Sequence, residues 1–155
     1  MTTEQVLSVL TETPTRLTAL ARGRTAADLT AAPEPGEWSP AEVLAHLRAC
    51  ADMWGSAITA IAIDQVTTIR AVSPRTWIQE TDYLSQPFRP ALRAFTTQRE
   101  ELLAVLRDLQ PDGWSRTTTV TGAGKPLDTS VQSYADRLAR HEHAHVGQIA
   151  RSLTL

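Results

Sequence analysis

The sequence predicts an all-α fold, a four-helix bundle with long connections between its helices. Four long segments carry apolar residues at helical spacing. Between them lie stretches punctuated by proline and glycine, at residues 31–36, 69–87 and 111–126. The chain has 155 residues, a natural size for one core. We therefore expect a single domain over residues 1–155.

The first predicted helix covers residues 3–22. Its apolar positions recur every three or four residues, as a buried helix face requires. Pro14 lacks the N–H that a helix interior uses, so we expect a kink or a restart there, with Thr13 as the cap. The apolar positions are Val6, Leu7, Leu10, Leu17 and Leu20.

The second predicted helix, residues 40–63, has the clearest start. Ser39 can cap it, Pro40 suits the first helical position, and Glu42 stands where a capping box needs an acid. Trp38 and Val43 are spaced for a hydrophobic staple. One stripe then holds Val43, Leu47, Cys50, Trp54, Ile58 and Ile61.

The third and fourth predicted helices cover residues 87–109 and 130–153. Each has an apolar stripe at helical spacing, with Leu92, Phe95, Leu102, Leu103, Leu106 and Leu109 on the third and Val131, Tyr134, Ala135, Leu138, Ile149 and Leu153 on the fourth. Before the last helix, residues 116–121 are rich in threonine and have strand propensity. We expect either a short hairpin or an extended loop there.

Composition excludes several classes of protein. A net charge of −2 and a pI of about 6.1 do not fit a strongly basic nucleic-acid-binding or membrane-surface protein. Aromatic residues make up only 5%, which leaves few rings for stacking bases. No apolar stretch reaches the roughly 18 residues of a membrane helix, and the start of the chain does not resemble a signal peptide. With Cys50 as the only cysteine, we expect a cytoplasmic protein.

The four histidines are His46, His141, His143 and His145. At about 100° per residue, His141 and His145 fall on the buried stripe of the last helix, one turn apart, whereas His143 faces away. His46 falls at the edge of the stripe on the second helix. We therefore expect three imidazoles to point into the bundle from two helices.

Buried imidazoles need partners, and a divalent metal is one solution. Two histidines spaced i, i+4 on a helix are a common metal-binding pattern. Three histidine ligands would leave one coordination position open, as catalytic sites do. The plainer interpretation remains that these are core-edge histidines bonded to carbonyls or carboxylates.

Three neighbouring residues are candidates for further roles. Glu142 could support a metal ligand, act as a catalytic base, or form an ion pair. Gln148 could hydrogen-bond a ligand or a ring nitrogen, or be an ordinary amide at the bundle edge. Cys50, one turn beyond His46, could line the same cavity as a thiol or be apolar filler.

Four fragments, in order along the chain, resemble the DinB/YfiT-like superfamily of metal-binding four-helix bundles. The similarity extends over about residues 5–153. The fragments are Thr13-Pro14 with Leu17 and Leu20, Pro35-Gly36-Glu37-Trp38-Ser39-Pro40-Ala41-Glu42-Val43-Leu44-Ala45-His46-Leu47, Trp114-Ser115-Arg116, and His141-Glu142-His143-Ala144-His145-Val146-Gly147-Gln148-Ile149.

The resemblance implies a metal triad at His46, His141 and His145. By the same resemblance the metal is a divalent transition ion, commonly zinc or nickel, and the protein is a homodimer. Activities in this superfamily vary. Some members are thiol S-transferases or isomerases that use mycothiol, bacillithiol or glutathione, and others resemble hydrolases. The superfamily's name does not imply DNA binding.

The first functional hypothesis is therefore a metal-dependent thiol S-transferase acting on a small-molecule substrate. Lys125 is the only lysine among 15 basic residues, a bias typical of high-GC genomes that favours mycothiol as the thiol. Arg48, Arg99 and Arg140 are candidates to hold a carboxylate or sugar, with solvated surface positions as the plainer interpretation. The alternatives are a metal-dependent hydrolase with Glu142 as base, and a non-catalytic stress protein that binds metal or a small ligand.

Overall fold

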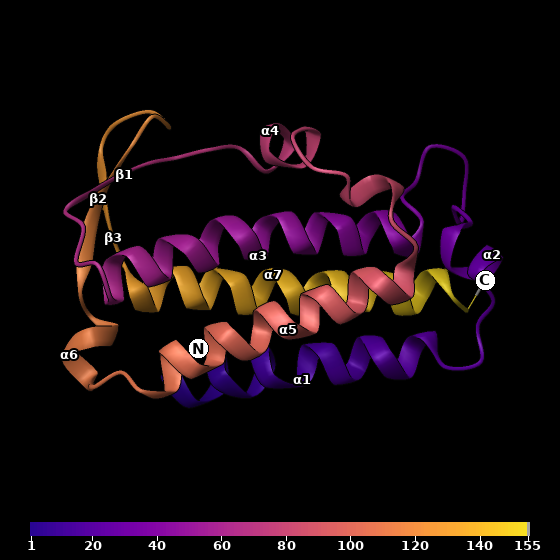
Figure 1. Ribbon diagram of the computed structural model, residues 1–155, viewed down its shortest axis with the longest axis horizontal. Helices are drawn as coiled ribbons and strands as arrows, with labels where there is room; N and C mark the ends of the chain where they lie inside the picture. The colour runs from indigo at the N-terminus through magenta and orange to yellow at the C-terminus, as the bar shows by residue number, and fades with distance from the viewer. Residues whose placement is uncertain (155) are drawn as a thin grey trace.

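The computed structural model describes residues 1–154 and confirms the four-helix bundle (Figure 1). The long helices are α1 (Thr3–Ala21), α3 (Pro40–Ala62), α5 (Phe88–Arg107) and α7 (Val131–Ser152). Each of these helices begins and ends within two residues of the boundaries predicted for it. Their apolar stripes face inward and form one continuous core.

The connections contain short elements that periodicity did not predict. The chain forms a small sheet in the order β1-β2-β3, in which β1 is parallel to β2 and β2 is antiparallel to β3. The prediction of a hairpin or extended loop near residue 116 is thus resolved as a hairpin. The short elements are α2 (Ala26–Thr30), β1 (Thr68–Arg70), α4 (Pro74–Gln79), the 3-10 helix η1 (Tyr83–Ser85), α6 (Pro111–Trp114), β2 (Thr117–Thr121) and β3 (Leu127–Ser130).

The order of the helices around the bundle explains the longest connection. Helix α7 packs against α1 and α3, and α5 packs against the same two helices. Helices α3 and α5 run in the same direction, so the chain between them must return along the bundle (Figure 1). Helix α3 has 23 residues and is about 35 Å long at 1.5 Å per residue. Residues 63–87, called the strap below, span this length outside α3 and carry β1, α4 and η1.

Capping signals set where the helices begin. Ser39 forms the expected capping box with Glu42 and starts α3. The same Ser-Pro signal at Ser73 and Pro74 starts α4 inside a stretch that we expected to be a break. Helix α4 has only six residues, too few for an apolar repeat to show in the sequence.

The expected restart of the helix at Pro14 is wrong, because α1 continues through it. Thr13 is not a cap; its buried hydroxyl donates to the Val9 carbonyl over 2.9 Å. Pro14 has no N–H, so the Leu10 carbonyl loses its usual partner in the helix. The Arg99 guanidinium on α5 donates to this carbonyl over 3.1 Å. A side chain from a neighbouring helix therefore satisfies the acceptor that proline leaves free.

Within residues 1–154, no helix combines the length and the apolar character needed to cross a bilayer.

Candidate metal centre

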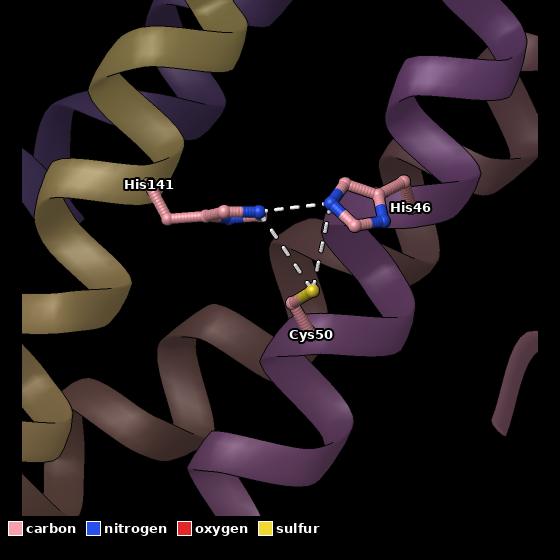
Figure 2. Close-up of side chains that lie close together, drawn as sticks. All are labelled: His46, Cys50 and His141. Atoms are coloured by element: carbon pink, nitrogen blue, oxygen red, sulfur yellow. Dashed lines mark hydrogen bonds between the residues drawn. The ribbon is translucent and has the colours of Figure 1, made fainter. Parts of the chain in front are cut away.

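Helices α3 and α7 pack side by side and bring the predicted residues together. His46 and Cys50 lie one turn apart on α3, and His141 and His145 lie one turn apart on α7. Figure 2 shows His46, Cys50 and His141 pointing toward one another across the space between the two helices. His143 is exposed, as expected from its position on the helix.

The donor atoms of His46, Cys50 and His141 lie within 4.8 Å of one another. The two imidazole Nε2 atoms are 2.9 Å apart, and the Cys50 Sγ lies 3.8 Å from each of them. The ring of His145 adjoins this set, with its centroid 4.4 Å from that of His141 and 4.9 Å from that of His46. We refer to these four side chains as the His/Cys cluster.

Gln148 orients the His145 ring. The Nδ1 of His145 lies 2.7 Å from the Gln148 amide oxygen. An amide oxygen only accepts hydrogen bonds, so Nδ1 of His145 donates this one, and Nε2 is the ring nitrogen left for another partner. This arrangement matches one of the two roles considered for Gln148, and it is the usual way in which proteins prepare a metal-binding imidazole.

Burial disfavours charge on His46, His141 and Cys50. Desolvation, reinforced by the other imidazoles, lowers the pKa of His141 to about 3. Desolvation and the nearby His145 also lower the pKa of His46. Desolvation, followed by the negative charge of Glu142, raises the pKa of the Cys50 thiol to about 12. Near neutral pH His46 and His141 therefore have free lone pairs, which metal binding requires, whereas the thiol retains its proton.

The geometry fits a divalent ion of the size of zinc. Bonds of about 2.0–2.1 Å place two nitrogen ligands about 2.9–3.4 Å apart, depending on the coordination geometry. The observed separation of 2.9 Å between the two Nε2 atoms lies at the short end of this range. The distance of 3.8 Å from each nitrogen to Sγ slightly exceeds that expected for a bound thiolate. The donor atoms that converge are therefore those of His46, Cys50 and His141, and the predicted third ligand His145 adjoins them through ring contacts.

Glu142 is removed from solvent and engaged elsewhere. Its side chain has 0% exposure, and both carboxylate oxygens accept from Arg99, which is 2% exposed. Of the three roles considered for Glu142, this geometry matches the ion pair. Its complete burial argues against a role as a catalytic base, because neither substrate nor water reaches it.

The other arginines considered as ligands also lie away from the His/Cys cluster's donor atoms. Arg48 is buried, donates to Gln86 over 2.8 Å and stacks on the Tyr83 ring at 3.8 Å. Arg140 is exposed and pairs with Asp136. The prediction of a solvated surface position is therefore wrong for Arg48 and Arg99, which are buried, and is confirmed for Arg140, which is exposed.

Two tryptophans flank the His/Cys cluster, a role that the sequence analysis missed. The Trp38 ring lies 5.2 Å from that of His46, and the Trp54 ring lies 5.0 Å from that of His141, in an edge-to-face arrangement. Trp54 was recognised as part of the apolar stripe of α3, and its spacing one turn after Cys50 was the available signal. Trp38 is 44% exposed, so the wall that it forms is open to solvent.

A cleft of about 570 Å³ begins on the other side of Trp54. Its lining comes from the second half of α3, the first half of α7, the strap and the sheet with its hairpin loop. Tyr134 and Arg137 line the cleft on α7, and Arg137 lies one turn before His141. The cleft and the His/Cys cluster are therefore neighbours along both helices.

Comparison with known proteins agrees with this architecture. The chain is similar to a solved structure described as "YfiT from Bacillus subtilis is a probable metal-dependent hydrolase with an unusual four-helix bundle topology". The two share 18% identity with a TM-score of 0.80, over 97% of this chain and 85% of the other, which supports the fold. No curated protein matches the sequence. The family model of the DinB superfamily matches residues 10–149, and the chain therefore belongs to the DinB superfamily.

Proposed function

We propose that this protein is a divalent-metal-dependent enzyme that transfers a low-molecular-weight thiol to a small electrophile. The observation that carries the proposal is the convergence of imidazoles from α3 and α7, with the Nε2 atoms of His46 and His141 2.9 Å apart. His46, His141 and His145 would hold the ion, and Gln148 would orient His145. Zinc or nickel fits these nitrogen donors.

A bound divalent ion would lower the pKa of a thiol substrate and so supply a thiolate at neutral pH. The sulfur then forms a bond to an electrophilic carbon of the second substrate, whose leaving group departs with the bonding electron pair. The thiol proton is released to solvent. The chain itself orients the imidazoles, with the Trp38 ring against His46 and the Trp54 ring against His141.

Burial of Glu142 removes the candidate general base of the hydrolase alternative. A hydrolase is helped by a general base that takes a proton from water, and Glu142 was the candidate for that role. Glu142 is inaccessible and paired with Arg99. A thiol whose pKa an ion lowers needs no such base, and neither does metal-bound water, so this observation bears on the role of Glu142 and not on the choice of nucleophile. A mycothiol-type thiol fits this proposal.

Elemental analysis of the purified protein tests whether the site binds metal. We expect about one equivalent of zinc or nickel in the wild type and a large loss in His46→Ala and His141→Ala. His143→Ala is the matched control, since His143 is an exposed histidine on the same helix, and it should retain the metal. Equal metal content in all four proteins would remove the basis of the proposal.

Cobalt substitution tests the donor set and the thiol. In Cys50→Ala loaded with cobalt(II), added mycothiol or glutathione should produce a sulfur-to-metal charge-transfer band. Calorimetry on the same sample should show binding at or below millimolar thiol. Retention of cobalt with no new band would mean that the thiol does not reach the ion. A sulfur band in the wild type without added thiol, lost in Cys50→Ala, would show a site closed by Cys50 and favour a non-catalytic metal-binding protein.

Hydrolysis is the second candidate, because the similar solved structure is described as a probable metal-dependent hydrolase. Water would then replace the thiol as the nucleophile. Panels of esters and amides test this candidate, and His145→Ala should abolish any turnover found. Turnover that survives this substitution would remove the His/Cys cluster from the mechanism.

A further inference from the structure

We infer that the cleft beside the His/Cys cluster binds a small carboxylate with an apolar or aromatic body, which is the electrophilic substrate of the enzyme. That this ligand is a substrate rests on the proposed function. The chemical class of the ligand follows from the residues that line the cleft.

The first observation is the position and size of the cleft. Its volume of about 570 Å³ lies within the range of small-molecule sites, roughly 300–1,000 Å³. Trp54 contributes to both places, since it lines the cleft and its ring lies 5.0 Å from that of His141. Trp54 is therefore a wall common to the cleft and the His/Cys cluster.

The second observation is the unpaired positive charge. The cations that line the cleft are Arg70 from β1, Lys125 from the hairpin loop and Arg137 from α7. All three are exposed, and none takes part in an ion pair within residues 1–154. Asp52 is the only acidic residue in the lining, and it already accepts from Trp77, Tyr83 and Gln98. The lining therefore has a net charge of +2, and none of its three cations is held in an ion pair.

The third observation is the apolar surface next to these charges. The guanidinium of Arg137 lies 5.9 Å from the centre of the Trp54 ring and 5.7 Å from that of Tyr134, within the roughly 6 Å range of cation–π contacts. These contacts place the Arg137 side chain over the aromatic floor, where it can form a fork with a carboxylate. Ala57, Ala60 and Val120 add small apolar surface. The lining thus suits a ligand with one anionic end and an apolar body.

Binding of 1-naphthoate to the metal-free protein, compared with neutral 1-naphthamide, tests the inference. A chelator is present, so that the carboxylate cannot bind through a metal. We expect naphthoate to bind about tenfold more tightly than naphthamide at low salt, with a smaller difference at high salt because exposed charges are screened. The indole N–H signals of Trp54 and Trp77, assigned by Trp→Phe variants, should shift on binding, and those of Trp38 and Trp114 should not.

Arg137→Gln should remove most of the preference for naphthoate and leave naphthamide binding unchanged. Arg93→Gln is the matched control, because Arg93 is an exposed arginine that does not line this cleft, and it should keep the preference. Equal affinities of the two probes, equal effects of the two substitutions, or shifts confined to Trp38 and Trp114 would each overturn the inference. No metal or turnover is needed here, so a failed metal analysis with selective naphthoate binding would reject the proposed function alone.

Discussion

At the scale of single residues, the buried pair of Arg99 and Glu142 is the most consequential contact behind the His/Cys cluster. Glu142 follows His141 directly on α7, and Arg99 also donates to the Leu10 carbonyl that Pro14 leaves free. One guanidinium therefore links α1, α5 and α7 at the level of the imidazoles. A buried charge that loses its partner costs far more than the pair contributes.

We expect Arg99→Met and Glu142→Leu each to lower the free energy of unfolding by about 3–5 kcal/mol. The double variant should lose much less than the sum, because neither charge is left alone. Urea unfolding measures all three.

Asp136→Ala is the control. It breaks a surface pair with Arg140 and a contact with the chain's amino group, and it should lower the free energy of unfolding by only about 1 kcal/mol. If Arg99→Met does not fold, a double variant that is folded and soluble still supports the prediction, because the single loss then exceeds the double one. Losses that add up in the double variant would show that the two charges are not coupled.

At the scale of elements, Asp52 ties the strap to the bundle. Its carboxylate accepts from Trp77 on α4 over 2.9 Å, from Tyr83 on η1 over 2.6 Å and from Gln98 on α5. Burial of the Tyr83 hydroxyl, and secondly its hydrogen bond to the Asp52 carboxylate, raise the pKa of Tyr83 to about 12. The strap contributes no fully buried side chain in α4 or η1, so these polar contacts matter for its position.

Asp52→Ala should therefore loosen the strap without unfolding the bundle. Hydrogen exchange of the strap amides should accelerate about tenfold, since three donors lose a shared acceptor, while exchange in α5 and α7 should stay the same. Mass spectrometry after deuterium labelling measures both regions. Asp64→Ala, at an exposed residue of the strap, serves as the control. Unchanged exchange over the strap in Asp52→Ala would mean that backbone contacts such as the pairing of β1 with β2 hold it.

At the scale of the whole molecule, the buried imidazoles make the metal-free protein sensitive to acid. The folded-state pKa values of His46 and His141 lie below the ordinary value of 6.5. Between that value and the folded-state value, the unfolded chain binds protons that the folded chain does not. Stability is therefore complete above about pH 6.5 and decreases as the pH falls toward 3.

We expect the free energy of unfolding of the chelator-treated protein to decrease from pH 7.5 to 5.5, a range in which exposed carboxylates do not titrate. His141→Gln should flatten this dependence, whereas His143→Gln should retain it. Urea unfolding at each pH measures the effect. The same dependence in both variants would assign it to groups outside the His/Cys cluster.

The oligomeric state also belongs to this scale. We propose a homodimer, and light scattering after size-exclusion chromatography distinguishes a dimer from a monomer of 17.0 kDa.

Local patterns in the sequence were enough to predict the four long helices, because their apolar stripes and caps are properties of neighbouring residues. They also placed His46, His141 and His145 on inward faces, since a helix rotates each residue by a constant angle. Periodicity could not show the partner of Glu142, because Arg99 is distant in sequence and meets it only through packing of α5 against the bundle. Nor could it show the cleft, which exists only because the strap returns along α3 and pairs β1 with β2. Local chemistry thus determined which residues face inward, and tertiary structure decided which of them meet and which charges remain unpaired.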